Sequence, residues 1–159
     1  MAGDRVVAPS ARDVLALKGR SLGPSAWLVV DQERVDAFAR SVDDWHWAHN
    51  DVELAVRGPF GGTIGHAHLT LAIVPHLFAS LVGFAEGEDA MFYGYDKVRF
   101  PTAVPVGSAI RMRADVADVV DLGVGEQLAV DLTVEIDGVE RPACVARALF
   151  RHYPVRAPA

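Results

Sequence analysis

The sequence predicts an α+β domain in which one buried helix is followed by a meander of antiparallel strands. Residues 65–84 are apolar on almost every helical face, which is typical of a helix that a sheet wraps around. Residues 108–121 and 127–137 alternate apolar and polar side chains, as half-buried strands do. The Asp137-Gly138 pair is a strong hairpin signal after the second of these segments.

The composition is that of one folded domain. The chain has 159 residues, of which 51% are hydrophobic, so it is long enough to bury a core without staples. We expect a single domain over residues 1–159, with residues 1–9 as a loose tail. The net charge of −6 argues against nucleic acid as a partner. The single cysteine, Cys144, excludes an internal disulfide and fits a reducing compartment.

Export and membrane insertion are not expected. The N-terminal residues carry charges and a proline where a signal peptide needs an apolar core. Residues 69–84 form an apolar segment of 16 residues that contains Pro75 and His76. This segment is too short and too interrupted to span a bilayer. We therefore expect a cytoplasmic protein with no membrane partner.

Two helices and a short strand are predicted before the buried helix. Ser10 is a suitable N-cap for a short helix, and residues 25–30 are rich in strand formers. Asp31 is a good N-cap for a helix over residues 32–42, where apolar residues fall at helical spacing. That helix is expected to deliver Asp44 at its C-terminal end.

The segment between this helix and the buried one is irregular and rich in aromatic and titratable residues. Asp51 is suited to cap a short helical turn, which Gly58-Pro59 would end. After the buried helix the sequence predicts four strands, over residues 90–100, 108–121, 127–137 and 141–153.

Asp44 and His49 are the first candidate catalytic residues. A carboxylate and an imidazole that meet at one water can activate it and return a proton to carbon. The two residues are five positions apart, so they converge only if the chain between them turns irregularly. The spacing alone leaves an alternative open, in which Asp44 caps the next turn and His49 bonds a backbone carbonyl.

The glycine-rich turn before the buried helix is the second candidate. A helix start offers unpaired N–H groups and a positive dipole end, which suit a developing oxyanion. The alternative is that the glycines serve only to form the turn.

Other kinds of site find little support. The histidines at positions 46, 49, 66 and 68 show no recognised metal-ligand spacing, so we expect no metal. A G-x-S-x-G pattern occurs at residues 19–23, but it lies between a predicted helix and a predicted strand, the reverse of the strand-to-helix turn of a nucleophile elbow. The sequence contains no phosphate-binding motif. Cys144 lies in an apolar strand and is expected to pack there. Basic residues alternate along two predicted strands, either as a solvated face or as a strip for the phosphates of a carrier group: Lys97, Arg99, Arg111 and Arg113.

Several separated stretches resemble one family. FARSVDDWHWAHND, then GPFGGTIGHAH, is similar to the hydratase motif of the MaoC-like dehydratases, a hot-dog-fold family that includes the R-specific enoyl-CoA hydratases. The later stretch YGYDKVRFPTAVPVGSAIRMRADV is similar to the strand pair that follows the family's central helix. The resemblance covers roughly residues 30–153.

The resemblance implies a curved antiparallel sheet wrapped around the helix at residues 65–84, in a homodimer with active sites near the subunit interface. It implies a lyase of fatty acid metabolism that adds water to trans-2-enoyl thioesters or dehydrates (R)-3-hydroxyacyl thioesters. Asp44 and His49 would share the acid–base work. Backbone N–H groups of Gly65, His66 and Ala67 would bind the thioester oxygen. Coenzyme A or an acyl carrier would enter as part of the substrate, and no cofactor is implied.

Four positions depart from the family pattern: Asp43 and Ala67 replace glycines, and His46 and His68 are unusual there. Two other functions remain open for such a chain. A hot-dog thioesterase would need a carboxylate on or beside the central helix, and residues 65–84 contain none. The second open function is that of a non-catalytic subunit that binds an acyl thioester or a partner chain. The presence of both Asp44 and His49 argues against it.

Overall fold

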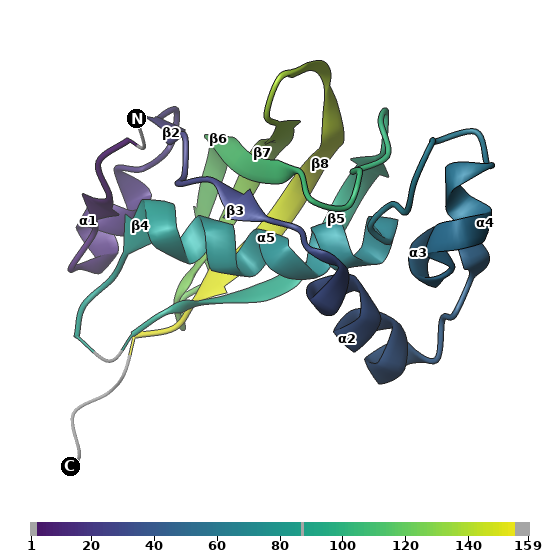
Figure 1. Cartoon of the computed structure of the whole chain (residues 1–159). Coiled ribbons are helices and arrows are strands. Elements are labelled where there is room, and N and C mark those ends of the chain that lie inside the picture. The colour runs from purple at the N-terminus through teal and green to yellow at the C-terminus, as the bar shows by residue number, and fades with distance from the viewer. Residues whose placement is uncertain (1–2, 87, 155–159) are drawn as a thin grey trace.

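A curved antiparallel sheet lies across one side of a long helix, α5 (Ala67–Leu81), in the computed structural model (Figure 1). The structure describes residues 3–86 and 88–154. The strand order is β2-β6-β7-β8-β5, and β3 also pairs with β6. The strands are β2 (Ser21–Leu22), β3 (Leu28–Val29), β5 (Ala90–Arg99), β6 (Ala109–Asp121), β7 (Glu126–Ile136) and β8 (Val139–His152).

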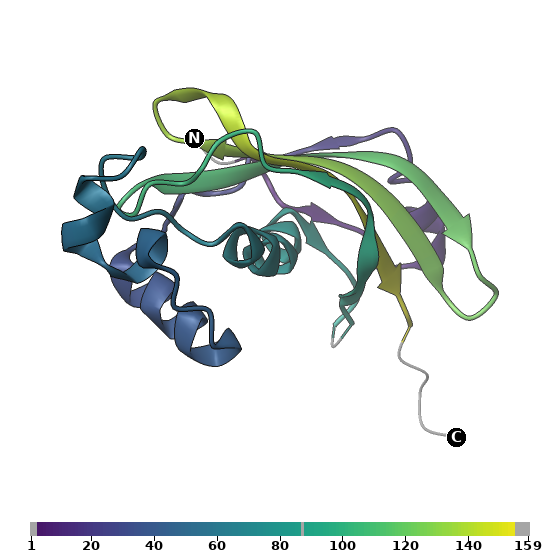
Figure 2. The same ribbon diagram turned by 90° about the vertical axis from the view of Figure 1, so that its right-hand side faces the viewer.

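The four long strands confirm the predicted meander. In β7 every second residue is buried, because alternate side chains point toward α5 and toward solvent. Asp137-Gly138 forms the hairpin between β7 and β8, with Gly138 at a φ of 71°. Figure 2 shows the sheet curving over α5, which is seen almost along its axis.

The core lies between α5 and the concave face of the sheet. Phe78 of α5 and Phe150 of β8 stack at its centre, with ring centroids 4.0 Å apart and an interplanar angle of 12°. Both side chains are almost completely buried. This contact fixes the helix against the longest strand of the sheet.

The helix itself is shorter and more exposed than the sequence predicted. It covers residues 67–81 rather than 65–84, and Ala72, His76 and Ser80 are exposed in the single chain. The sheet covers only one side of α5, so the apolar composition of the helix does not mean that every face of it is buried. Among the helices that the structure describes, none is long and apolar enough to cross a membrane.

The prediction of a loose tail over residues 1–9 is wrong for its described part. Val6–Val7 form β1, which pairs in parallel with β4 (Val82–Gly83) directly after α5. Ala8 is buried in the core. β-Branched residues are good strand formers, and pairing with β4 satisfies their backbone groups. Residues 1–2 lie outside the described part.

The N-terminal helices follow the capping signals in the sequence. The Ser10 side chain caps α1 (Ala11–Leu15), and Asp31 Oδ1 accepts from the Arg34 N–H at 2.9 Å to cap α2 (Gln32–Val42). The strand predicted over residues 25–30 shortens to β3. Ser25 instead turns inward, where its Oγ accepts from the backbone N–H of Met112.

Two short helices complete the arm between α2 and α5: α3 (Trp47–Asn50) and α4 (Val52–Val56). The predicted cap is confirmed, since Asp51 Oδ1 accepts from the Leu54 N–H at 2.9 Å. Together, α2, α3 and α4 lie beside the N-terminal end of α5 (Figure 1). This arm brings the candidate residues Asp44 and His49 to the start of the central helix.

Candidate active site

Asp44 is placed by the way α2 ends. Asp43 is the C-cap and adopts a left-handed conformation, with φ at 57° and ψ at 31°. The N–H groups of Asp43 and Asp44 both donate to the carbonyl of Ala39. This turn reverses the chain and directs it toward α3. A left-handed position favours glycine, which explains why the family pattern has glycine where this chain has Asp43.

Replacing Asp43 by glycine is expected to stabilise the protein. An L-residue pays a steric cost in the left-handed region that glycine avoids, so Asp43→Gly is expected to raise the free energy of unfolding by about 0.5–1 kcal/mol. Urea denaturation measures this change, and Asp43→Ala is the control, with an expected loss. An Asp43→Gly variant less stable than the parent would contradict the left-handed cap.

His49 is held by a hydrogen bond from one ring nitrogen. Its Nδ1 lies 2.7 Å from the carbonyl oxygen of Ile64, which can only accept, so Nδ1 donates. In the neutral ring this leaves the Nε2 lone pair free. Burial lowers the pKa of His49 against the opposing effect of the Ile64 bond, and nearby His66 lowers it further. The neutral ring, which can accept a proton, is therefore favoured at neutral pH.

The structure brings the two predicted residues together. Ring or carboxylate atoms of Asp44, His49 and His66 lie within 4.8 Å of one another. One half of the alternative prediction also holds, because His49 does bond a backbone carbonyl. The other half is wrong: the next turn, α3, is capped by His46, whose Nδ1 accepts from the Ala48 N–H. Asp44 remains with an exposed carboxylate that faces the two rings.

The same three residues fit a metal poorly. The rings of His49 and His66 stack at 3.7 Å with an interplanar angle of 28°. Imidazole lone pairs lie in the plane of the ring, so two stacked rings do not direct them at one ion. His49 Nδ1 and His66 Nε2 are also committed to backbone carbonyls. The geometry therefore suits proton transfer better than metal binding.

Of the three backbone N–H groups predicted to bind the thioester oxygen, two are available at the start of α5. Gly65 was predicted to take part, but its N–H donates to the carbonyl of Val104 at 2.8 Å. The first helical bond runs from the Thr70 N–H to the carbonyl of His66. Among the described residues, the N–H groups of His66 and Ala67 have no hydrogen-bond acceptor, and no side chain caps the helix. They remain free for an anionic oxygen.

A cavity of about 460 Å³ opens onto these groups. Asp44, His49 and the turn at residues 64–68 are among the residues that line it. Ala67 has an ordinary helical backbone and is exposed at the cavity wall beside His68. The other lining residues were not singled out from the sequence: Phe60 before the glycine pair, Thr70 in α5, Phe100, Thr102 and Val104 after β5, and Ala143 in β8.

A polar network behind the site was also missed. The amide nitrogen of Gln32 donates to the backbone carbonyl of His49 at 2.8 Å and to Asp36 at 2.8 Å. Thr63 donates to the Gln32 amide oxygen, and Asn50 donates to Asp36. The network ties α2, α3 and the turn together around His49. Polar residues near a helix start carry no signal that would have singled them out.

The remaining sequence predictions concern the sheet. Arg111 and Arg113 both bind Glu135, as expected of a solvated face. Lys97 and Arg99 line a separate cavity of about 620 Å³ with acidic neighbours, including Asp96 and Asp131. Cys144 is confirmed as a packing residue: it is buried, and burial raises its pKa to about 11.

Comparison with known proteins gives consistent matches. Residues 13–138 match the model of the "MaoC like domain" family. The chain is 42% identical over 144 residues to "3-hydroxyacyl-thioester dehydratase Z" of Mycobacterium tuberculosis, covering 90% of this chain and 95% of that protein. It is 36% identical over 140 residues to "Nodulation protein N" of Rhizobium leguminosarum bv. viciae, covering 86% and 87%.

The fold has matches among solved structures. An (R)-hydratase from A. caviae superposes with a TM-score of 0.67 at 19% identity, covering 84% of this chain and 94% of that chain. This likeness confirms the predicted α+β hot-dog fold. With the family model matching most of its length, the chain belongs to the MaoC-like dehydratase family.

Proposed function

We propose that this protein is a hydro-lyase that adds water to trans-2-enoyl thioesters and, in reverse, dehydrates (R)-3-hydroxyacyl thioesters. The observation that carries the proposal is the convergence of Asp44, His49 and the free N–H groups of residues 66 and 67 on one cavity. The similarity to a 3-hydroxyacyl-thioester dehydratase along nearly the whole of both chains supports the same reaction.

Each group has a role in the reaction. Asp44 and His49 hold one water, and their pair accepts a proton as the water oxygen bonds to the β-carbon. The electrons of the double bond move toward the thioester carbonyl, whose oxygen is stabilised by the N–H groups of His66 and Ala67. A proton from the pair then bonds to the α-carbon. The hydroxyl and the proton together account for one water, and the two residues titrate as a coupled unit.

The substrate is an acyl thioester of coenzyme A or of an acyl carrier. The reaction moves only the elements of water, so the proposal needs no cofactor or metal. The apolar walls at Phe60, Phe100, Val104 and Ala143 suit an acyl chain in the cavity beside the acid–base pair.

Purified protein mixed with crotonyl-CoA tests the reaction. We expect the enoyl-thioester absorbance to fall while free thiol stays constant. Release of thiol would instead indicate a thioesterase, which the lack of any acidic residue in α5 disfavours. Stable absorbance and thiol across short and long enoyl chains would contradict the proposal and leave a binding subunit.

A homodimer and a cytoplasmic location complete the proposal. β5 is an edge of the sheet, and its residues Met91, Phe92 and Tyr93 are exposed. An exposed apolar edge strand favours pairing with a second copy. Sedimentation equilibrium is expected to give twice the chain mass of 17.1 kDa, and a single-chain mass would exclude the dimer.

The proposed cytoplasmic location rests on the cysteine content. The single cysteine of the chain, Cys144, is buried and is compatible with a reducing compartment.

A further inference from the structure

The side chain of His66 links the two proposed catalytic residues. It is only 2% exposed, and its ring contacts those of His49 and Phe38, at centroid distances of 3.7 and 5.1 Å. Its Nε2 lies 3.0 Å from the backbone carbonyl oxygen of Asp44. We propose that His66 is a positioning residue that fixes Asp44 against His49. This inference rests on the proposed function and deepens it.

The hydrogen bond has a defined direction. The carbonyl oxygen of Asp44 can only accept, so Nε2 of His66 donates. The same nitrogen lies 4.0 Å from the Asp44 carboxylate oxygen Oδ2. His66 Nδ1 is buried and has no partner among the described residues. The polar contacts of the ring are therefore directed at Asp44.

Asp44 needs such a support because of where it lies. Residues 43–46 are exposed, and they join the left-handed end of α2 to the start of α3. His66, by contrast, is the buried N-cap residue of α5, which the core holds. The bond thus ties an exposed segment to the helix that packs in the core. Without it, the Asp44 carboxylate would keep its chemistry and lose its fixed position.

The ring contact acts on the second residue of the pair. Stacking on His66 and the bond from Nδ1 to Ile64 together restrict the plane of the His49 ring. The free Nε2 then keeps one direction relative to Asp44. Small errors in such geometry are costly in catalysis, since a misplacement of about 1 Å can cost on the order of 10²-fold in rate.

Two variants separate the hydrogen bond from the ring. His66→Phe keeps an aromatic ring and removes the donor, whereas His66→Gln keeps an amide N–H at the position of Nε2. With crotonyl-CoA, we expect His66→Phe to lower kcat about tenfold or more with KM changed less than about threefold. His66→Gln is expected to retain a kcat at least about threefold above that of His66→Phe. Thermal unfolding of each variant shows whether it is folded.

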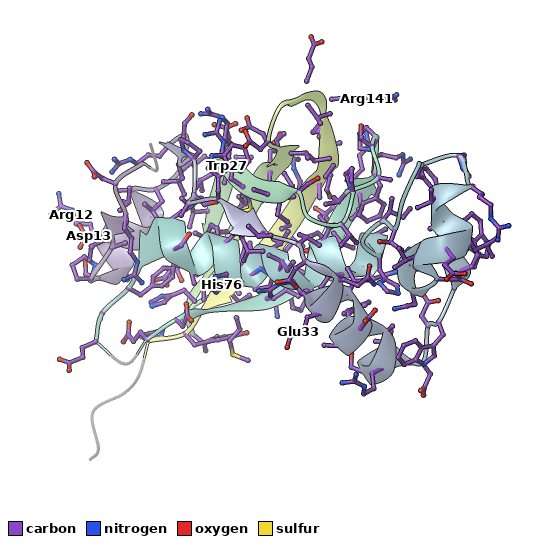
Figure 3. All side chains as sticks on the ribbon, in the orientation of Figure 1. Arg12, Asp13, Trp27, Glu33, His76 and Arg141 are labelled. Atoms are coloured by element: carbon purple, nitrogen blue, oxygen red, sulfur yellow. The ribbon has the colours of Figure 1, made fainter. Side chains whose placement is uncertain are left out.

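His76 provides the matched control. It is an exposed histidine of the same helix, away from the α2–α4 arm (Figure 3), and His76→Phe is expected to leave kcat unchanged. An active parent with a His66→Phe variant of normal kcat would overturn the inference. So would a His66→Gln variant as slow as His66→Phe. An inactive parent would instead count against the proposed function.

A spectroscopic readout tests the inference without any substrate. In the ¹⁵N-labelled parent protein, we expect His66 to show an Nε2-bound proton that is protected from exchange with solvent. The Asp44→Asn variant should keep this signal, because the acceptor is the backbone carbonyl. A neutral His66 that carries its proton on Nδ1, or an Nε2 proton that exchanges as fast as that of His76, would overturn the inference.

Discussion

Asp44→Asn and His49→Ala are each expected to lower the rate of crotonyl-CoA hydration by about 10²-fold or more. Each change removes one partner of the pair that holds and deprotonates the water, and positioned acid–base groups typically contribute about 10²–10⁴-fold. The Asp44→Asn change keeps the size of the side chain and removes its basicity. Steady-state kinetics that follow the enoyl absorbance measure the loss.

The neighbouring carboxylate supplies the control for this experiment. Asp43→Asn removes an exposed charge one residue away and preserves a side chain that tolerates the left-handed cap. Its rate is expected to stay within about threefold of the parent. If Asp44→Asn or His49→Ala were equally active, neither residue could hold the role proposed for it.

Among the substitutions proposed for this protein, Phe150→Ala is expected to cause the largest loss in the free energy of unfolding. Phe150 is fully buried in β8 and stacks on Phe78, so truncation leaves a cavity where helix and sheet meet. Buried Phe→Ala changes typically cost about 3–5 kcal/mol. Such a loss is a large part of the roughly 5–15 kcal/mol that stabilises a typical domain. Denaturant unfolding at a fixed protein concentration measures it.

Phe150→Leu is the matched variant, because it retains most of the apolar volume. It is expected to lose clearly less stability than Phe150→Ala. A Phe150→Ala protein within about 1 kcal/mol of the parent would mean that the stacked pair is not the centre of the core.

Local signals in the sequence were enough for most of the fold. Side-chain alternation located the long strands, and the caps at Ser10, Asp31 and Asp51 were predicted correctly. Tertiary pairing was not accessible in this way. The pairing of β1 with β4 joins residues about 75 positions apart, and neither strand is long enough to show the alternation of apolar and polar residues. The open side of α5 was missed because hydrophobicity does not reveal which side a sheet covers.

The site was predictable only in part, for a similar reason. The resemblance pointed to Asp44, His49 and the helix start, and the structure brings them together. The hydrogen-bond partners of Gly65 and His66 were not predicted. The Gly65 N–H is used by Val104, and the ring of His66 bonds Asp44 rather than serving only through its backbone. Such pairings depend on long-range geometry that residue spacing does not contain.

A structure of the Asp44→Asn variant with unreacted crotonyl-CoA would show where the thioester binds relative to the acid–base pair. We expect the thioester oxygen within hydrogen-bond distance of the N–H groups of His66 and Ala67. The β-carbon should face residue 44 and His49, with room for one water between them. A thioester bound elsewhere, or an acyl chain pointing away from His49, would show that these groups do not act together on one substrate.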